Sequence, residues 1–219
     1  MNYLQLVNDF MIETDMDDQI VTVTGQIDDG LKATIWIRDA WTQIQRNEKW
    51  DFMFREGFLP TIIGQDSYDI STIQYNNYPN DTIGSVDINS FRNEATKTRM
   101  SQAYAESLRW QTGTGSPTRV ALSRDATYVI VAPVPVVVEA LTMDTWSSPI
   151  VLTLDTDTPT LAPEFHKAIV WVAISNYARE QGAEWNGLYL AANREFNQIY
   201  STMTNRYMPR MFPKVGLTN

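Results

Sequence analysis

Helical hydrophobic periodicity occurs near both ends of this chain and is absent from the long stretch between them. Apolar side chains recur every three or four residues in 2–13, in 26–49, and again from Pro163 to Arg206. That spacing places apolar residues on one face of an α-helix. Because these stretches lie at opposite ends of the sequence, they can share one core only if the middle of the chain forms an insertion.

The clearest helical pattern lies between Trp185 and Arg206. Its apolar residues follow one another at steps of three or four, namely Trp185, Leu188, Ala192, Phe196, Ile199 and Met203. A preceding stripe runs from Phe165 to Tyr177 and on to about Glu180, after a proline that suits a first helical turn. In 26–49 the apolar face is wider than a surface helix needs.

From Trp50 to about Asp157 the chain is broken by Gly and Pro, and short β-rich runs alternate with turn residues. These runs are Asp51–Phe58, Thr61–Ile63, Ser67–Ile70, Ser85–Phe91, Thr118–Ser123, Ala126–Val131 and Val134–Thr145. Runs of this length and spacing predict a small antiparallel sheet or sandwich. A short helix is predicted within this region over Ser101–Gln111.

The order of these elements predicts an α+β protein, in which a helical bundle formed by the N- and C-terminal helices carries an inserted antiparallel β domain. The bundle comprises 1–49 and 159–206, the inserted β-rich domain 50–158, and an extended C-terminal docking tail 207–219. Two prolines in the tail prevent a continued helix. Its many apolar side chains indicate that it binds a surface instead of remaining in water.

Composition excludes most catalytic chemistry. The chain of 219 residues has no Cys and one His, which removes disulfides, thiolate catalysis, Fe–S clusters and Cys-based zinc sites. We therefore expect no cofactor, no metal and no enzyme. The longest apolar runs are too short for a transmembrane helix, and the first residues lack the basic start and long apolar stretch of a signal peptide.

Three motifs have a chemical interpretation and a simpler structural one. Gly113-Thr-Gly-Ser-Pro lacks the Lys-Ser/Thr ending of a phosphate loop and is expected to be a turn. Asp15-Met-Asp-Asp lacks the Gly and distal Glu of a calcium loop and is expected to be solvated. His166 beside Glu164 could form a hydrolase base, but no nucleophile signature accompanies it, which favours a packing or hydrogen-bonding role.

Seven tryptophans are many for a chain of this length. Exposed aromatic rings on the inserted domain, such as Trp110 and Trp146, could stack on sugar rings. Burial in the two cores and at contacts between subunits is the favoured interpretation, since large aromatics concentrate there.

Charge is distributed unevenly along the chain. The 17 Lys and Arg and 26 Asp and Glu give a net charge of −9, which argues against a protein that binds nucleic-acid phosphates over its whole surface. The last acidic residue is Glu195, and it is followed by Arg206, Arg210 and Lys214. An acidic body with a basic C-terminal segment favours head-to-tail association with an acidic neighbour.

Both helical ends resemble the head-to-tail adaptor, or connector, proteins of tailed phages. The N-terminal similarity lies in Leu4–Asn8, Val21–Gln26, Ile35–Gln45 and Trp50–Phe52, and the C-terminal similarity in Pro163–Trp171 followed by Tyr177-Ala. The middle shares only a looser pattern, namely Phe91-Arg92, Pro117-Thr-Arg119 and strands that end at Pro133. Two stretches depart from the pattern of the family. Gly115-Ser-Pro117 stands where a Gly-Arg-Pro turn is expected, and Val136–Glu139 stands where a Tyr-rich strand is expected.

The resemblance implies a structural virion protein of the neck, assembled in the host cytoplasm. Such adaptors form a homo-oligomeric ring, expected to be a dodecamer, that attaches to the portal protein and extends the DNA channel toward the tail. Packaged double-stranded DNA then passes through the lumen without specific binding, and the next neck or tail component binds below. The alternative is a tail or baseplate structural protein with a glycan-binding β insertion. The residues expected to dock on the portal or on neighbouring subunits are Arg206, Tyr207, Met208, Arg210, Met211, Phe212 and Lys214.

Overall fold

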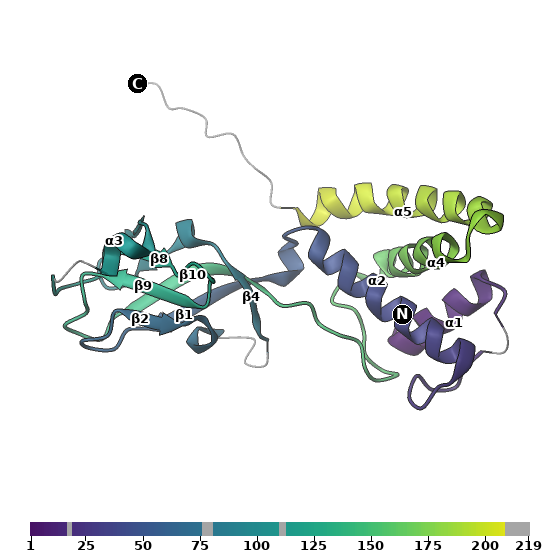
Figure 1. The fold of residues 1–219 in the computed structure, drawn as a ribbon, viewed down its shortest axis with the longest axis horizontal. Coiled ribbons are helices and arrows are strands. Elements are labelled where there is room, and N and C mark those ends of the chain that lie inside the picture. Colours follow the sequence, from purple (N-terminus) through teal and green to yellow (C-terminus); the bar gives the residue numbers. More distant parts are fainter. Residues whose placement is uncertain (17–18, 76–80, 110–112, 209–219) are drawn as a thin grey trace, which may run out of the picture. The chain divides into compact units, whose positions relative to one another are not determined.

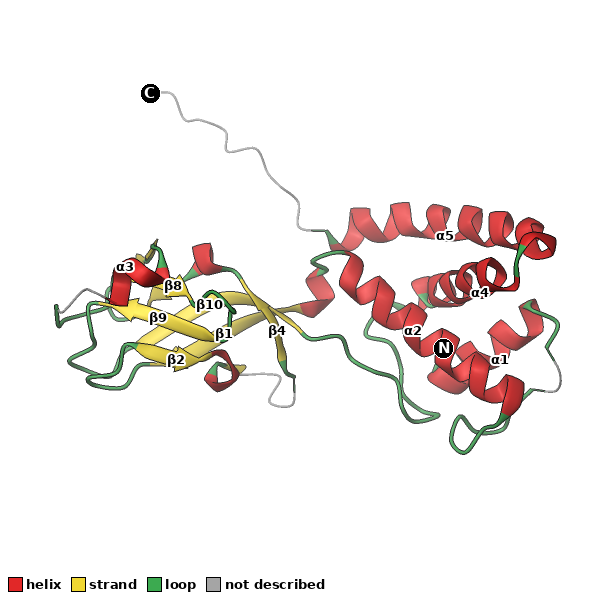
Figure 2. Cartoon of the chain, viewed as in Figure 1, coloured by secondary structure: helices red, strands yellow, loops and turns green. Residues whose placement is uncertain are grey.

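The computed structural model describes residues 1–16, 19–75, 81–109 and 113–208. Its elements are helices and strands in separate parts of the chain, which confirms the α+β class (Figures 1 and 2). The chain divides into two compact units. Met1–Phe52 and the described residues from Pro149 onward form a helical unit, and Met53–Ser148 forms a β-rich unit.

In the residues that the structure describes, the helical unit contains four α-helices. They are α1 (Tyr3–Glu13), α2 (Asp28–Asn47), α4 (Lys167–Gln181) and α5 (Asn186–Tyr207), with short 3-10 helices η1 (Asp51–Met53), η4 (Pro163–Phe165) and η5 (Ala183–Trp185). Helix α4 packs against each of the other three (Figure 1). The periodic apolar side chains of all four helices meet in a core that includes Leu6, Phe10, Ile37, Trp41, Ile44, Ile169, Ile174 and Met203. The helices predicted from periodicity are therefore confirmed, with ends displaced by only a few residues.

Local sequence explains where these helices begin. At the start of α1, the side chain of Asn2 accepts a hydrogen bond from the N–H of Gln5, and the side chain of Gln5 accepts one from the N–H of Asn2. This reciprocal pair satisfies two donors that a helix start leaves open. Helix α2 has Asp28 and Asp29 in its first turn and Arg46 in its last, which complements the helix dipole.

The described strands of the β-rich unit form two sheets. The first has the order β3-β1-β10-β5-β6, with β4 also paired to β10, and the second has the order β2-β9-β8-β7. The bounds are β1 (Phe54–Pro60), β2 (Ser67–Asp69), β3 (Gln74–Tyr75), β4 (Ile83–Val86), β5 (Arg92–Asn93), β6 (Thr98–Arg99), β7 (Ser101–Gln102), β8 (Arg119–Leu122), β9 (Tyr128–Ala132) and β10 (Ala140–Ser147). The unit also contains helix α3 (Ala105–Arg109) and the 3-10 helices η2 (Ile70–Thr72) and η3 (Ile88–Ser90).

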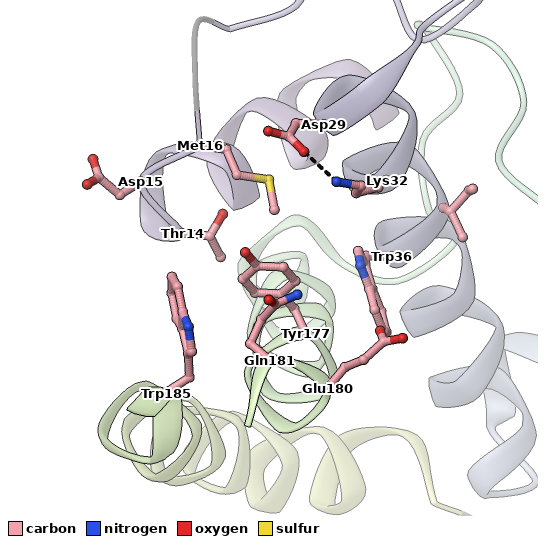
Figure 3. Close-up of a pocket in the computed structure, with 11 residues that line it drawn as sticks. Thr14, Asp15, Met16, Asp29, Lys32, Trp36, Tyr177, Glu180, Gln181 and Trp185 are labelled. Atoms are coloured by element: carbon pink, nitrogen blue, oxygen red, sulfur yellow. Dashed lines mark hydrogen bonds and ion pairs between the residues drawn. The ribbon is translucent and has the colours of Figure 1, made fainter. Parts of the chain in front are cut away.

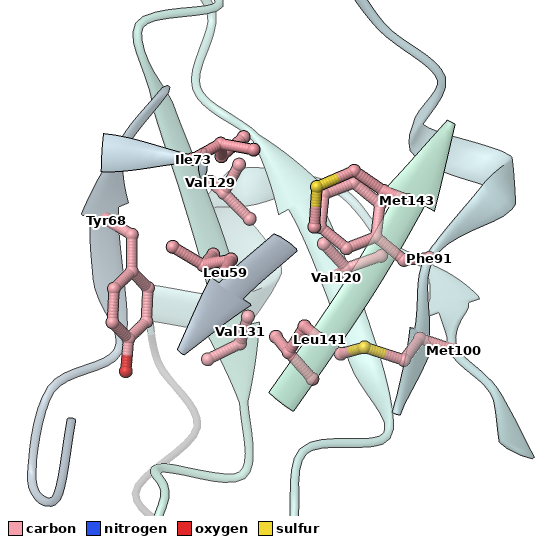
Figure 4. Packing of buried hydrophobic residues seen from close by; sticks show 10 residues of the cluster. All are labelled: Leu59, Tyr68, Ile73, Phe91, Met100, Val120, Val129, Val131, Leu141 and Met143. Atoms are coloured by element: carbon pink, nitrogen blue, oxygen red, sulfur yellow. The ribbon is translucent and has the colours of Figure 1, made fainter. Parts of the chain in front are cut away.

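One face of each sheet supplies the core of this unit. Burial alternates strictly along β10, so that Leu141 and Met143 are buried while Thr142 and Asp144 are partly exposed. Figure 4 shows these two side chains among apolar residues from both sheets. The β-rich unit therefore has a hydrophobic core of its own, made by residues spread over 59–143.

Several predicted strands are wrong in extent. Asp51–Met53 and Ile88–Ser90 form 3-10 helices, so Asp51–Phe58 becomes a strand only from Phe54, and of Ser85–Phe91 only Ser85 and Val86 lie in a strand. In two other cases the residues form linked loops. Thr61–Ile63 is not a strand, and the strand predicted from Val134 begins only at Ala140. The N–H of Thr61 donates to the carbonyl of Glu139 at 2.8 Å. This hydrogen bond joins the two loops, but they do not pair as strands. Pro133 and Pro135 lack the N–H groups that a continued strand requires.

The predicted helix over Ser101–Gln111 is also shorter, and the sheets are not wholly antiparallel. Helix α3 covers Ala105–Arg109, and Ser101–Gln102 pairs with β8 in parallel. Trp110 and Gln111 of the predicted helix lie outside the described residues. Leu108 of α3 is buried and Tyr104 is exposed. Hydrogen bonding to the edge of β8 has overridden the helical spacing of these residues.

The segment 149–162 lies with the helices, although sequence pattern alone assigns most of it to the β-rich stretch. The N–H of Tyr3 donates to the carbonyl of Asp157 at 2.7 Å. The Asp155 carboxylate accepts the N–H of Val23 at 2.6 Å, and the Gln45 side chain bonds both backbone groups of Ile150. These bonds tie the segment to α1, to α2 and to the loop before α2.

Candidate interaction site

His166 has a structural position. Its ring is fully buried, with Nε2 2.8 Å from the carbonyl oxygen of Leu161 and Nδ1 2.7 Å from the amino nitrogen of Met1. Because a carbonyl oxygen only accepts, Nε2 carries the proton and Nδ1 accepts. The carboxylate of Glu164 pairs with Arg206. The hypothesis of a hydrolase base made by His166 and Glu164 therefore has no geometric support.

Burial of His166 gives the fold a predicted pH dependence. Desolvation lowers the pKa of His166 below its ordinary value of 6.5, so the unfolded chain binds this proton more readily than the folded one. We expect this contribution to the free energy of unfolding to be complete above about pH 6.5 and to be lost progressively as the pH falls below it. Urea unfolding between pH 5 and 8 measures the effect, and His166→Gln is the non-titrating control. Parallel pH profiles for the two proteins would contradict the prediction.

The predicted docking residues divide into two groups. Arg206, Tyr207 and Met208 are described by the structure, whereas Arg210, Met211, Phe212 and Lys214 lie outside the described residues. Helix α5 continues through Tyr207, and the backbone becomes extended at Met208. The segment that follows the helix therefore begins at a defined point.

The start of the C-terminal segment is fixed to the helical unit. The N–H of Ala162 donates to the hydroxyl oxygen of Tyr207 at 3.0 Å. The ring of Tyr207 stands edge-on to Phe52 and Phe165, with centroid separations of 5.3 and 5.8 Å. The Arg206 guanidinium, paired with Glu164, lies 5.6 Å from the centroid of the Phe165 ring. Arg206 and Tyr207 thus contact their own subunit and define where the basic segment leaves it.

A groove that sequence reasoning did not identify lies elsewhere on the helical unit. It has a volume of about 640 Å³ and is bounded by the end of α1, one side of α2, the end of α4 and η5 (Figure 3). Its lining residues are Thr14, Asp15, Met16, Asp29, Lys32, Ile35, Trp36, Tyr177, Glu180, Gln181 and Trp185. Three separate parts of the sequence, 14–16, 29–36 and 177–185, therefore converge on it.

Three aromatic side chains line the groove in a row. The Tyr177 ring lies between Trp36 and Trp185, with edge-to-face contacts at 6.3 and 5.4 Å (Figure 3). Phe10 supports Tyr177 from the core at 5.8 Å. Among the described residues, the hydroxyl of Tyr177 and the indole N–H groups of Trp36 and Trp185 have no hydrogen-bond partner. The row thus offers apolar faces together with polar atoms that a bound chain can satisfy.

The rim of the groove is acidic. Lys32 pairs with Asp29 at 2.8 Å, which neutralises one carboxylate. Asp15 and Glu180 have no ion-pair partner within the part of the chain that the structure describes. Burial raises the pKa of the Tyr177 hydroxyl and the nearby Asp29 carboxylate raises it further, so Tyr177 remains a donor at neutral pH. An aromatic groove with two uncompensated carboxylates favours a ligand that is both apolar and basic.

Two sequence signals pointed toward this groove without locating it. The apolar face of α2 is wider than a surface helix needs. Ile35 belongs to this face, is partly exposed and lines the groove. Asp15 belongs to the acidic motif that we expected to be solvated, and it is indeed exposed. Neither signal indicates that Tyr177 and Trp185 line the same groove as Ile35 and Asp15.

The remaining tryptophans give no support to a sugar-binding surface. Trp41 and Trp50 are fully buried in the helical unit. Trp146 stands edge-on to Phe54 at 6.0 Å within the β-rich unit, and Trp110 lies outside the described residues. Trp171 is partly buried, with the Lys167 ammonium 5.2 Å from its ring centroid. Within the part of the chain that the structure describes, no observation favours the glycan-binding alternative.

Comparison with known protein families identifies a match over nearly the whole chain. The family model described as SU10 adaptor protein matches residues 1–211, which include both units. No curated protein matches the chain. No helix in the described parts of the chain has the length and apolar character needed to cross a membrane.

Proposed function

Because this chain belongs to the SU10 adaptor protein family, we propose that it is a structural protein of the virion neck of a tailed phage. It forms a homo-oligomeric ring that attaches to the portal, extends the DNA channel toward the tail and receives the next neck or tail component. The observation that carries this proposal is the family match over residues 1–211. Since the match covers both the helical and the β-rich unit, both belong to the adaptor.

The organisation of the chain supports a repeated building block. The backbone leaves the helical unit after Phe52 and returns at Pro149. We infer that the helical unit is the bundle through which copies associate and that the β-rich unit is an insertion in it. A cyclic ring requires two different contact surfaces on each subunit, because such interfaces are heterologous. The helical unit carries both a groove and a basic segment, which satisfy this requirement.

Charge supports a passage for DNA in preference to a binding site. The net charge of the chain is −9, and phosphates are repelled by an acidic wall. We infer that packaged DNA moves through the ring without specific contacts. The segment beyond Met208 combines Arg210 and Lys214 with apolar side chains, and these supply docking contacts during assembly.

Electron microscopy of the purified chain mixed with its portal protein tests this function. We expect closed rings of the chain stacked coaxially on portal rings, with an axial channel continuous through both. Portal alone and portal mixed with an unrelated acidic protein of similar size are the controls. Particles in which portal rings never carry a second ring, at concentrations well above micromolar, would contradict the proposal.

A further inference from the structure

We propose that the groove formed by α1, α2, α4 and η5 binds the C-terminal segment 209–219 of a neighbouring copy of the chain. This inference rests on the proposed function, since it assigns one of the contacts that hold the ring together. The ligand is a basic, proline-containing peptide with apolar side chains. The groove and the start of the segment lie at opposite ends of the same helix, α5.

The side-chain chemistry of the segment matches that of the groove. Residues 209–219 read Pro-Arg-Met-Phe-Pro-Lys-Val-Gly-Leu-Thr-Asn. Grooves lined by aromatic rings bind proline-containing segments, because proline rings pack between aromatic faces and the restricted backbone loses little entropy. Trp36, Tyr177 and Trp185 supply such faces at successive positions. Their free N–H and O–H groups can donate to the carbonyl oxygens of a bound peptide.

Electrostatics favour the same pairing. Arg210 and Lys214 are the only charged side chains in the segment, and both are basic. Asp15 and Glu180 are the two groove carboxylates that Lys32 does not neutralise. Opposite charges on the two surfaces steer their association and fix the register of the bound peptide.

Chain length favours a groove on another copy over the groove on the same subunit. Trp185 immediately precedes α5 and lines the groove, while the segment leaves the helical unit after Tyr207. The 22 residues of α5 span about 33 Å at a rise of 1.5 Å per residue. Lys214 follows Tyr207 by seven positions, and seven extended residues span at most about 25 Å. The backbone of these basic residues therefore falls short of Trp185 on the same subunit, which favours a groove on another copy.

This arrangement also matches the symmetry of a ring. Each copy donates its segment to one neighbour and receives a segment from the other, so the contact is heterologous. An interface of this kind closes into a ring when the rotation between copies is a fraction of a full turn. The contact between the groove and the segment of a neighbouring copy therefore suits a closed ring.

Cysteine cross-linking of the full chain distinguishes binding between copies from binding within one copy. The natural sequence has no Cys, so introduced thiols report only on their own proximity. We expect the variant with Gln181→Cys and Val215→Cys to form disulfide-linked multimers on mild oxidation, visible as a ladder on non-reducing gels. The matched control replaces Gln181→Cys by Thr96→Cys, an exposed position in the β-rich unit, and is expected to give far fewer multimers. A fast-migrating monomer with an internal disulfide, or multimer yields equal to the control, would overturn the proposal.

Charge reversal tests the chemistry of the contact. Two double variants reverse the charges of one partner each. The segment variant carries Arg210→Glu and Lys214→Glu, and the groove variant carries Asp15→Lys and Glu180→Lys. Each is expected to weaken self-association about tenfold or more in sedimentation experiments. Combining all four substitutions in one chain is expected to restore association. Asp39→Lys with Glu106→Lys is the control for net charge, since both side chains are exposed and lie outside the groove. Circular dichroism melting confirms that each variant is folded.

The outcomes separate this inference from the proposed function. If wild-type chain forms rings on the portal and the groove variant does so equally well, the groove is not the receptor and the inference is wrong while the function stands. If only the segment variant loses portal attachment, the segment binds the portal directly, which also overturns the inference. If the wild-type chain itself never joins the portal, the proposed function fails.

Discussion

Deletion of residues 209–219 is expected to leave a folded subunit that no longer forms rings or joins the portal. The deletion removes Arg210, Lys214 and the apolar side chains between them, but no contact that the structure describes. We therefore expect an unchanged melting temperature together with loss of ring-bearing portal particles in electron micrographs. Sedimentation velocity provides the independent measure of self-association. Normal rings and normal portal attachment by the deleted chain would contradict this prediction.

A second deletion that begins at Tyr207 is the informative comparison. Tyr207 packs edge-on to Phe52 and Phe165 and accepts a hydrogen bond from Ala162. Two such aromatic contacts and one hydrogen bond together stabilise a fold by about 1–4 kcal/mol. The longer deletion should therefore lower the melting temperature, whereas the shorter one should not. Equal melting of the two deleted chains would show that Tyr207 does not anchor the segment.

Trp50→Ala is expected to have the largest effect on stability, lowering the free energy of unfolding by about 3–5 kcal/mol. The Trp50 side chain is fully buried, and its indole N–H donates to the carbonyl of Ile44 at 2.7 Å. Its ring stacks on Phe52 at 5.9 Å and stands edge-on to Tyr200 at 5.8 Å. Truncation thus leaves a cavity where three parts of the helical unit meet. Urea unfolding followed by circular dichroism at 222 nm measures the effect.

Two matched substitutions separate the contributions at this position. Trp50→Phe keeps most of the apolar contact but loses the donor to Ile44, so we expect a loss of about 1–3 kcal/mol. Trp185→Ala removes a partly exposed ring of the groove and should lower stability by no more than about 1 kcal/mol. It should nevertheless weaken self-association. A Trp50→Ala protein as stable as the wild type would contradict the packing described here.

The helices of this protein were predictable because their determinants are local. Apolar residues at steps of three and four, Asn2 before α1 and Pro163 before α4 all act within a few residues of the helix that they specify. The strands were less predictable. Val134–Glu139 has a strong β-rich composition, but Pro133, Pro135 and the hydrogen bonds to the loop after β1 keep it from forming a continued strand.

Determinants that lie far apart in the sequence explain the errors of the prediction. Ser101–Gln102 became a strand because the edge of β8, formed almost twenty residues later, offered parallel hydrogen bonds. The segment 149–162 lies with the helices because Asp155 and Asp157 bond the backbone near α1 and before α2. Such pairings depend on where the chain folds back, and composition does not encode this.

The sequence by itself determined the class of the fold, the absence of thiol chemistry and the separation of an acidic body from a basic C-terminal segment. Periodicity and charge are properties of the residues and hold in any conformation. Only the tertiary structure decided that Arg206 and Tyr207 fix the start of that segment, and that Asp15, Trp36, Tyr177 and Trp185 share one groove. The physical reason is that a groove arises from the packing angles of several helices, which depend on the whole core and not on any one stretch of sequence.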